Sequence, residues 1–153
     1  MDLVLWRHAE AEDGEDDMKR ALTPKGRRQA ARMAQWLKAH VPPPWTVYAS
    51  PAVRTQETVD ALHMPFTTLE ACRPGAAPEA VLAAAGWPHA VGSVIVVGHQ
   101  PTLGMAGALA LTGQPQPWSL RKGAVAWLSS RERQGALASV QLRAYLSPEL
   151  VND

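Results

Sequence analysis

The stretch Ser93-Val94-Ile95-Val96-Val97-Gly98 is the strongest strand signal in the chain, and it restricts the possible folds more than any other feature. Apolar residues follow one another here without alternating with polar ones, which is typical of a strand buried on both faces. Leu3-Val4-Leu5-Trp6 has the same character. Such strands occur in parallel sheets that helices cover on both sides, so the pattern predicts an α/β fold.

Helix signals separate the strand signals. Thr23-Pro24 is typical of a helix start, with Thr as the N-cap and Pro at the first helical position, and this helix should run to about His40. The other expected helices run from Ser50 to about Leu62, from Pro78 to about Ala85 and from Pro101 to about Leu111, and the other expected strands cover 46–49, 66–69, 124–129 and 138–145. The last two strands, joined by a polar turn, should add an antiparallel edge. The prediction is one domain over residues 1–153, a three-layer α/β/α sandwich with a mostly parallel central sheet.

Composition places the chain among ordinary folded proteins. Of its 153 residues 46% are hydrophobic and 19% are charged, which argues against disorder. The formal net charge of +1 gives no reason to expect a nucleic-acid or membrane partner. A single cysteine, Cys72, excludes an internal disulfide and a Cys-based zinc cluster and fits a reducing compartment. Because no run approaches the ~20 apolar residues of a spanning helix, we expect a cytoplasmic protein.

Three of the predicted strands end in residues that can carry chemistry. Arg7-His8 follows the first strand, Ser50-Pro51 leads from the second strand to Arg54, and His99-Gln100 follows the strand ending at Gly98. In open parallel sheets, ligands bind beyond the carboxyl ends of the strands. If these strands are neighbours, two histidines and two arginines converge on one pocket.

This set of side chains suits phosphoryl transfer. Helix N-termini and guanidinium groups bind phosphate oxygens, arginine in a bidentate arrangement. An imidazole beside them can attack phosphorus and hold the phosphoryl group covalently. Phosphoryl transfer depends mostly on positioning and on charge stabilisation, both of which such a pocket would supply.

The same residues resemble a known family. Leu5-Trp6-Arg7-His8-Ala9-Glu10-Ala11 resembles the Arg-His-Gly/Ala signature of the histidine phosphatase superfamily, which includes the cofactor-dependent phosphoglycerate mutases. Further segments are similar to its SixA branch of small phosphohistidine phosphatases: Leu22-Thr23-Pro24-Lys25-Gly26, Ala49-Ser50-Pro51-Ala52-Val53-Arg54-Thr55 with Thr58, and Val97-Gly98-His99-Gln100-Pro101. The resemblance covers residues 1–130 in the family's order.

The resemblance implies a role for each matching residue. It makes His8 the phosphorylated nucleophile, Arg7 and Arg54 the phosphate clamps, and His99 the partner that stabilises the transferring group. It implies a phosphoglycerate mutase-like fold with a minimal lid, no cofactor and no metal. We also expect Ser50 and Gln100 to contact the substrate.

The general acid is less clearly marked. Larger members of the family use a Glu after a later strand, and Glu70 is the nearest match by position, although its flanking residues match poorly. Glu10 and the acidic residues between Glu12 and Asp17 could also approach the site. The basic helix residues Arg27, Arg28 and Arg32 are expected to form a solvated face.

Short connections after Glu70 and Pro101 leave little room for a lid, and an open site suits a phosphorylated side chain on a protein. Phosphohistidine also needs little help from a general acid, because its protonated imidazole is a good leaving group. We therefore expect a phosphohistidine phosphatase acting on a protein. The alternatives are a small-molecule phosphomonoesterase and a non-catalytic phosphate-binding module. His8-Ala9-Glu10 also matches the His-x-Glu of zinc deaminases, but a single cysteine excludes their Pro-Cys-x-x-Cys motif.

Overall fold

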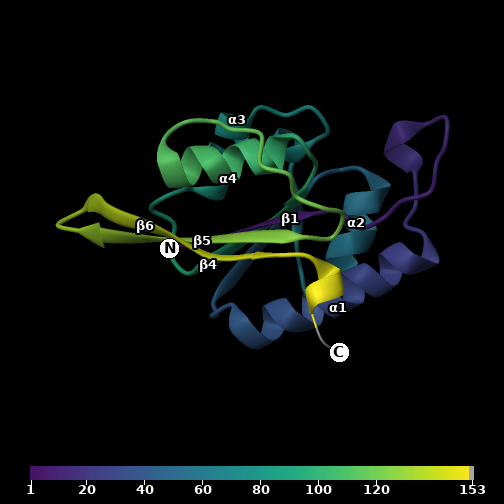
Figure 1. Cartoon of the computed structure of the whole chain (residues 1–153), viewed down its shortest axis with the longest axis horizontal. Helices are drawn as coiled ribbons and strands as arrows, with labels where there is room; N and C mark the ends of the chain where they lie inside the picture. The colour runs from purple at the N-terminus through teal and green to yellow at the C-terminus, as the bar shows by residue number, and fades with distance from the viewer. Residues whose placement is uncertain (152–153) are drawn as a thin grey trace.

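A six-stranded mixed sheet forms the centre of the molecule in the computed structural model, which describes residues 1–151 (Figure 1). The strands are β1 (Asp2–Arg7), β2 (Trp45–Ala49), β3 (Thr67–Thr68), β4 (Ser93–Gly98), β5 (Val125–Arg133) and β6 (Ala136–Leu146), in the spatial order β3-β2-β4-β1-β5-β6. The first four strands pair in parallel, and β5 and β6 continue the sheet antiparallel beyond β1. The predicted α/β fold is confirmed, with its mostly parallel sheet and antiparallel edge.

Helices cover both faces of the sheet. They are α1 (Pro24–His40), α2 (Val53–Asp60), α3 (Pro78–Ala85) and α4 (Thr102–Thr112), with short 3-10 helices η1 (Asp17–Lys19), η2 (Glu70–Cys72) and η3 (Pro148–Leu150). In Figure 1, α3 and α4 lie on one side of the sheet and α1 lies on the other. None of the helices in residues 1–151 is both long enough and apolar enough to cross a membrane.

Strand β1 shows why its sequence lacks alternation. Leu3 and Leu5 pack into the core beneath α3 and α4, whereas Val4 and Trp6 pack into the core against α1. All four side chains are fully buried. Burying each contributes roughly 1.5–3 kcal/mol, so both faces of this strand stabilise the fold.

Helix α2 and the last two strands, β5 and β6, differ from their predicted lengths. Helix α2 begins at Val53 and not at Ser50, because the Ser50 hydroxyl accepts a hydrogen bond from the Ala52 amide (3.2 Å) and forms a turn before the helix. The hairpin of β5 and β6 is longer than expected and projects beyond the helices in Figure 1. Its outer residues are exposed on both faces, so they lack the alternation that reveals a half-buried strand.

Candidate active site

The carboxyl ends of β1, β2 and β4 meet at one edge of the sheet. Arg7 pairs with Gly98 in the strand register, and Ala49 pairs with Val97, so the residues that follow the three strands emerge side by side. A pocket of about 210 Å³ opens at this edge. It is lined by Arg7, His8, Ala11, Arg20, Arg54, Pro74, His99, Gln100 and Lys122. The structure therefore brings together the two histidines and two arginines that the sequence predicts to converge.

His8 is fixed by the backbone on both sides. Its amide donates to the Gly98 carbonyl and its carbonyl accepts from the Gly123 amide, both at 3.0 Å. The ring Nδ1 lies 2.8 Å from the Ala9 carbonyl oxygen. A carbonyl only accepts, so Nδ1 carries the proton and Nε2 keeps its lone pair.

The surroundings of His8 keep its ring neutral. Burial lowers the pKa of His8 to about 4; the hydrogen bond to Ala9 opposes this change, and the charges of Arg54 and Arg7 add to it. At neutral pH the imidazole is therefore uncharged, and Nε2 is available as a nucleophile.

His99 lies across the pocket, with its ring centroid 5.3 Å from that of His8. Its Nδ1 is 3.4 Å from the Arg54 Nη2, and its Nε2 is 2.7 Å from the Ser50 hydroxyl. A guanidinium only donates, so Nδ1 is the acceptor and Nε2 donates to Ser50. Burial, followed by the charges of His8 and Arg54, lowers the pKa of His99 to about 3. A bound anion would oppose this shift and favour the protonated ring.

The two arginines reach the pocket from different elements, Arg7 from the end of β1 and Arg54 from the first turn of α2. Arg54 is 4% exposed, and its Nη1 donates to the Asp17 carbonyl (2.7 Å) while its Nη2 pairs with the Asp17 carboxylate (3.2 Å). Arg7 Nη1 donates to the Leu120 carbonyl (2.8 Å), and burial lowers its pKa. The Nε of each arginine is buried without a hydrogen-bond partner among the described residues. An unpartnered buried donor costs roughly 1–3 kcal/mol, so these guanidinium groups favour an oxyanion beside them.

The motif residues around the pocket hold its backbone in place. The Thr58 hydroxyl accepts from the Ala9 amide (3.0 Å) and donates to the Arg54 carbonyl (2.7 Å), which ties the loop after His8 to α2. At Gly26 in α1, an added Cβ would lie 2.0 Å from the Glu10 carbonyl oxygen. Only glycine allows α1 to approach this loop so closely.

The other predicted site residues have different surroundings. Ser50 is fully buried and does not line the pocket; it supports His99. Gln100 lines the pocket, but its amide accepts from the Gly104 amide (2.7 Å) and donates to the Trp118 carbonyl (2.8 Å). Glu70 is exposed at the start of η2 and is not part of the pocket wall. Substrate contact by Ser50 and Gln100 and acid catalysis by Glu70 stay predictions.

Of the acidic residues before α1, Asp17 is the one in the described part of the chain that is bonded to Arg54, a pocket residue. Desolvation raises its pKa, but the hydrogen bond from Arg20 and the charge of Arg54 outweigh this effect and lower it. Asp17 is therefore ionised at neutral pH and suited to orienting Arg54. Glu10 Oε2 accepts from the Thr23 hydroxyl (2.8 Å) at the start of α1.

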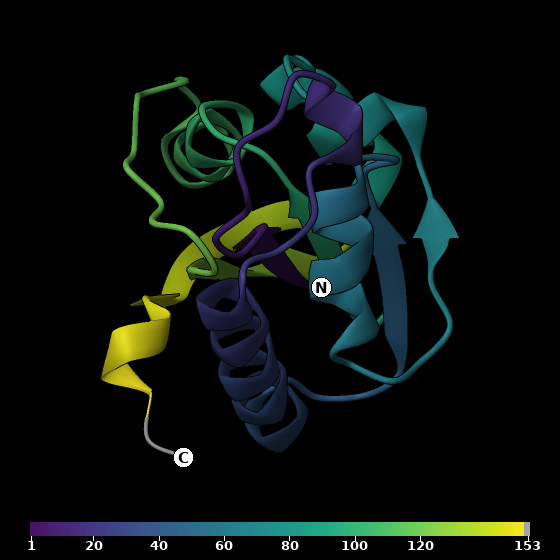
Figure 2. The same ribbon diagram turned by 90° about the vertical axis from the view of Figure 1, so that its right-hand side faces the viewer.

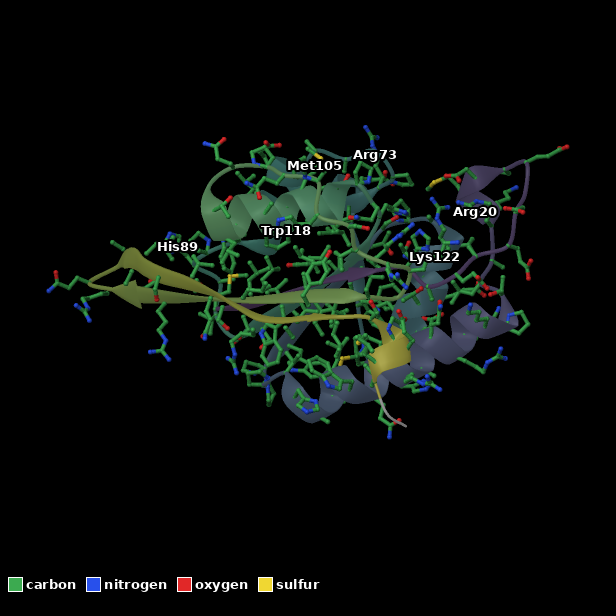
Figure 3. All side chains as sticks on the ribbon, in the orientation of Figure 1. Arg20, Arg73, His89, Met105, Trp118 and Lys122 are labelled. Atoms are coloured by element: carbon green, nitrogen blue, oxygen red, sulfur yellow. The ribbon has the colours of Figure 1, made fainter. Side chains whose placement is uncertain are left out.

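Arg20 and Lys122 are pocket residues that the sequence analysis missed. Both line the pocket wall, and Figure 3 shows them at the same end of the sheet, far from His89. Arg20 stands two residues before the Leu22-Thr23-Pro24 motif, and this closeness to a family motif is a sequence signal that could have identified it. Lys122 carries no local signal, because only the pairing of β5 with β1 brings it to the site.

The described residues, 1–151, contain neither a candidate metal-binding cluster nor a reactive thiol. No three His, Cys, Asp or Glu side chains within residues 1–151 are grouped to hold a metal ion. Cys72 is buried, and burial raises the pKa of its thiol to about 11.

Comparison with known proteins agrees with this geometry. Residues 3–72 match the histidine phosphatase superfamily (branch 1). A structure from Nakamurella multipartitia, named as a candidate phosphohistidine phosphatase SixA, is 30% identical, with a TM-score of 0.77 and coverage of 96% of this chain and 95% of that chain. The chain belongs to the histidine phosphatase superfamily.

Other solved structures are similar over nearly their full length. The protein histidine phosphatase SixA complexed with tungstate is 26% identical, with a TM-score of 0.79 and 97% of each chain covered. A phosphoserine phosphatase from Entamoeba histolytica is 17% identical, with a TM-score of 0.69 and coverage of 97% and 98%; this likeness shows the fold alone. No curated protein sequence matches the chain significantly.

Proposed function

We propose that this superfamily phosphatase removes phosphate from phosphohistidine on a protein and carries the phosphoryl group on His8 during turnover. The observation that carries the proposal is the state of His8. Its Nδ1 is tied to the Ala9 carbonyl and its pKa is lowered to about 4, which leaves Nε2 free in a pocket that also contains Arg7, Arg54 and His99. The likeness to SixA structures at 26–30% identity supports the choice of phosphohistidine.

Substrate binding rests on the charges of the pocket. The guanidinium groups of Arg7 and Arg54 hold the phosphoryl oxygens, and His99 donates to a further oxygen once it takes up a proton. The hydrogen bond between His99 Nε2 and Ser50 fixes the ring, so that Nδ1 faces Arg54 and the anion. Arg54 and His99 are buried and already oriented, so they stabilise the charge of the transition state without reorganising.

The first chemical step transfers the phosphoryl group to the enzyme. His8 Nε2 attacks phosphorus, a new N–P bond forms, and the N–P bond of the substrate breaks. The electron pair of the broken bond stays on the substrate imidazole, which leaves as a neutral ring because its other nitrogen already carries a proton. The Ala9 carbonyl stabilises the Nδ1 proton of the phosphorylated His8.

The second step releases phosphate. Water attacks the phosphorus of phosphorylated His8, the N–P bond breaks, and its electron pair returns to Nε2. The water contributes a hydroxyl group to the phosphate and loses one proton to the solvent or to a phosphate oxygen. His8 is then neutral, as it was before the reaction.

The lining of the pocket supports a substrate that needs no strong acid. Within residues 1–151, the pocket wall contains no carboxylate, and Asp17 behind Arg54 is held in its ionised form. An alkyl phosphate ester must expel a basic alkoxide, which is slow without an acid, whereas phosphohistidine expels neutral imidazole. Residues 1–153 would form the single catalytic domain, and the free thiol of Cys72 fits a cytoplasmic protein.

A direct comparison of substrates tests the proposal. We expect a protein phosphohistidine to be hydrolysed much faster than phosphoserine or a sugar phosphate, at equal concentrations near neutral pH and after subtraction of spontaneous hydrolysis. Equal or faster turnover of a sugar phosphate would contradict the proposal and indicate a small-molecule phosphomonoesterase. Glu70→Gln would then be the first variant to examine for loss of an acid.

A further inference from the structure

A second cavity of about 760 Å³ lies beside the catalytic pocket, bordered by α1, the segment before β5 and η3. Figures 1 and 2 show η3 next to α1 at this end of the molecule. We call this cavity the basic groove. Its basic side chains are Arg7, Lys25, Arg28, Arg32, Arg121 and Lys122, and its acidic ones are Glu10 and Glu149. The groove therefore has four positive charges in excess, although the whole chain has a formal net charge of +1.

The basic groove is continuous with the catalytic pocket. Arg7 and Lys122 line both cavities, so a molecule bound in the groove reaches the phosphate clamp directly. The half-buried side chain of Arg7 lies where the groove and the catalytic pocket meet, so it lines both cavities. Whatever binds the groove therefore lies beside the phosphoryl group undergoing transfer.

Helix α1 presents three of its basic residues to the groove in a row. Lys25, Arg28 and Arg32 are three and four residues apart, which places them on one face of the helix. From Lys25 to Arg32 the helix rises about 10 Å, so the charges are spread along the groove and do not surround one point. This spacing suits several separate negative charges better than one phosphate group.

Three basic side chains of the groove, Lys25, Arg28 and Lys122, take no part in holding the fold together. Among residues 1–151, the side chains of Lys25, Arg28 and Lys122 make no hydrogen bond or ion pair. Arg27, the neighbour of Arg28, instead pairs with Glu57 at 2.8 Å and lies outside the groove. The expected solvated basic face is therefore divided: Arg27 supports the fold, whereas Arg28 and Arg32 line a cavity.

The acidic and basic residues around the site lie mostly in separate segments of the chain. Acidic residues fill the segment before α1, namely Glu12, Asp13, Glu15, Asp16 and Asp17. This segment contributes Asp17 to Arg54, while the basic groove begins at Arg7. An acidic partner would be attracted to the groove and repelled by the segment, which would fix its orientation.

We propose that the basic groove is the docking site for an acidic segment of the phosphorylated protein, next to its phosphorylated residue; this inference rests on the proposed function. Carboxylates spaced along a polypeptide match the row of charges on α1. The described lining of the groove contains no aromatic side chain on which a nucleobase could stack. The groove is thus better suited to Asp and Glu side chains than to a nucleotide.

Two peptides test the docking site. Both carry one phosphohistidine, flanked in one peptide by Glu and Asp and in the other by Gln and Asn. At low ionic strength we expect kcat/KM to be on the order of tenfold higher for the acidic peptide, mainly through a lower KM. Equal kcat/KM for the two peptides would overturn the proposal.

A matched pair of variants locates the effect. Arg28→Glu and Lys38→Glu change an exposed cation of α1 in the same way, but only Arg28 lines the groove. Arg28→Glu should reduce the ratio of kcat/KM between the acidic and neutral peptides to about one or below, and Lys38→Glu should preserve it. An equal reduction in both variants would indicate a general charge effect and would overturn the docking site.

Failure of the proposed function gives a different result. The same acidic and neutral flanks are placed around phosphotyrosine, an aryl ester with a good leaving group. If phosphohistidine is not preferred but the acidic phosphotyrosine peptide is, the docking site stands and only the substrate assignment fails. If phosphohistidine is preferred but flanking charge has no effect in either peptide pair, the docking site fails alone.

Discussion

The catalytic pocket and the basic groove hold similar side chains in opposite surroundings. In the pocket Arg54 is buried, and neighbouring charges contribute to lowering the pKa of His8 to about 4 and of His99 to about 3. In the groove Lys25 and Arg28 are exposed to solvent. Charges in a poorly solvated site act strongly on the bonds that change, whereas exposed charges are screened by water and salt. The two proposals therefore give the same residue type a chemical role in the pocket and a recognition role in the groove.

The largest expected effect that separates the two regions comes from Arg54. Arg54→Ala should lower kcat/KM by about 10²–10³, because a buried charged donor to the transferring phosphoryl group is lost. Arg54→Lys should recover only part of this loss, since an ammonium lacks the bidentate fork. The matched control is Arg131→Ala, an exposed arginine of the β5–β6 hairpin, which should keep full activity. Steady-state rates on an aryl phosphate measure this, and unchanged kinetics in Arg54→Lys would contradict the proposed clamp.

An effect of intermediate size is the pH dependence of the free energy of unfolding, which the buried His8 and His99 should produce. Both pKa values are lower in the folded chain than the ordinary value of 6.5, so the unfolded chain binds more protons between about pH 4 and that value. The free energy of unfolding should therefore fall as pH decreases from about 6.5 towards 4. Denaturant titrations at several pH values measure this change.

The same titrations in the presence of inorganic phosphate test whether an anion in the pocket changes the pKa of His99. An anion beside His99 favours its protonated ring, so saturating phosphate should raise the pKa of His99 and reduce the loss of stability at low pH. Ring ¹⁵N chemical shifts report the protonation state of each histidine. A His99 that titrates near its ordinary pKa in the free protein would show that the pocket does not desolvate it.

The smallest expected effect is the response to salt. Raising the ionic strength from about 0.1 M to about 1 M shortens the Debye length from roughly 10 Å to roughly 3 Å. Turnover of an aryl phosphate, which uses only the buried pocket, should decrease by less than about threefold. Turnover of the acidic phosphopeptide should decrease more, because it also uses the exposed groove. Identical salt dependence for the two substrates would contradict the claim that the phosphopeptide uses the exposed groove in addition to the buried pocket.

The strands, helices and central pocket residues were predictable because their signals are local. The uninterrupted apolar run Val94–Val97 of β4 and the Thr23-Pro24 start of α1 each specify an element without reference to distant residues. Parallel strands then bring Arg7-His8 and His99 to the same edge of the sheet. The catalytic roles of these residues stay proposals.

What the sequence did not reveal depends on distant pairings. The basic groove combines Lys25 and Arg28 with Arg121 and Glu149, which are more than ninety residues away along the chain. The bond between Asp17 and Arg54 likewise joins two segments with no shared motif. The supporting bonds of Ser50 and Gln100 are also long-range or local capping contacts that residue type alone does not specify.

Detection of the phosphorylated enzyme tests the central claim most directly. The protein is mixed briefly with a phosphohistidine peptide or an aryl phosphate and quenched in alkali, in which phosphohistidine is stable; its intact mass is then measured and the modified residue is mapped. The account predicts one added phosphoryl group on His8, present in His89→Ala, whose histidine is exposed and distant from the pocket, and absent in His8→Ala. Substantial turnover by a folded His8→Ala variant, or a phosphoryl group on another residue, would contradict it.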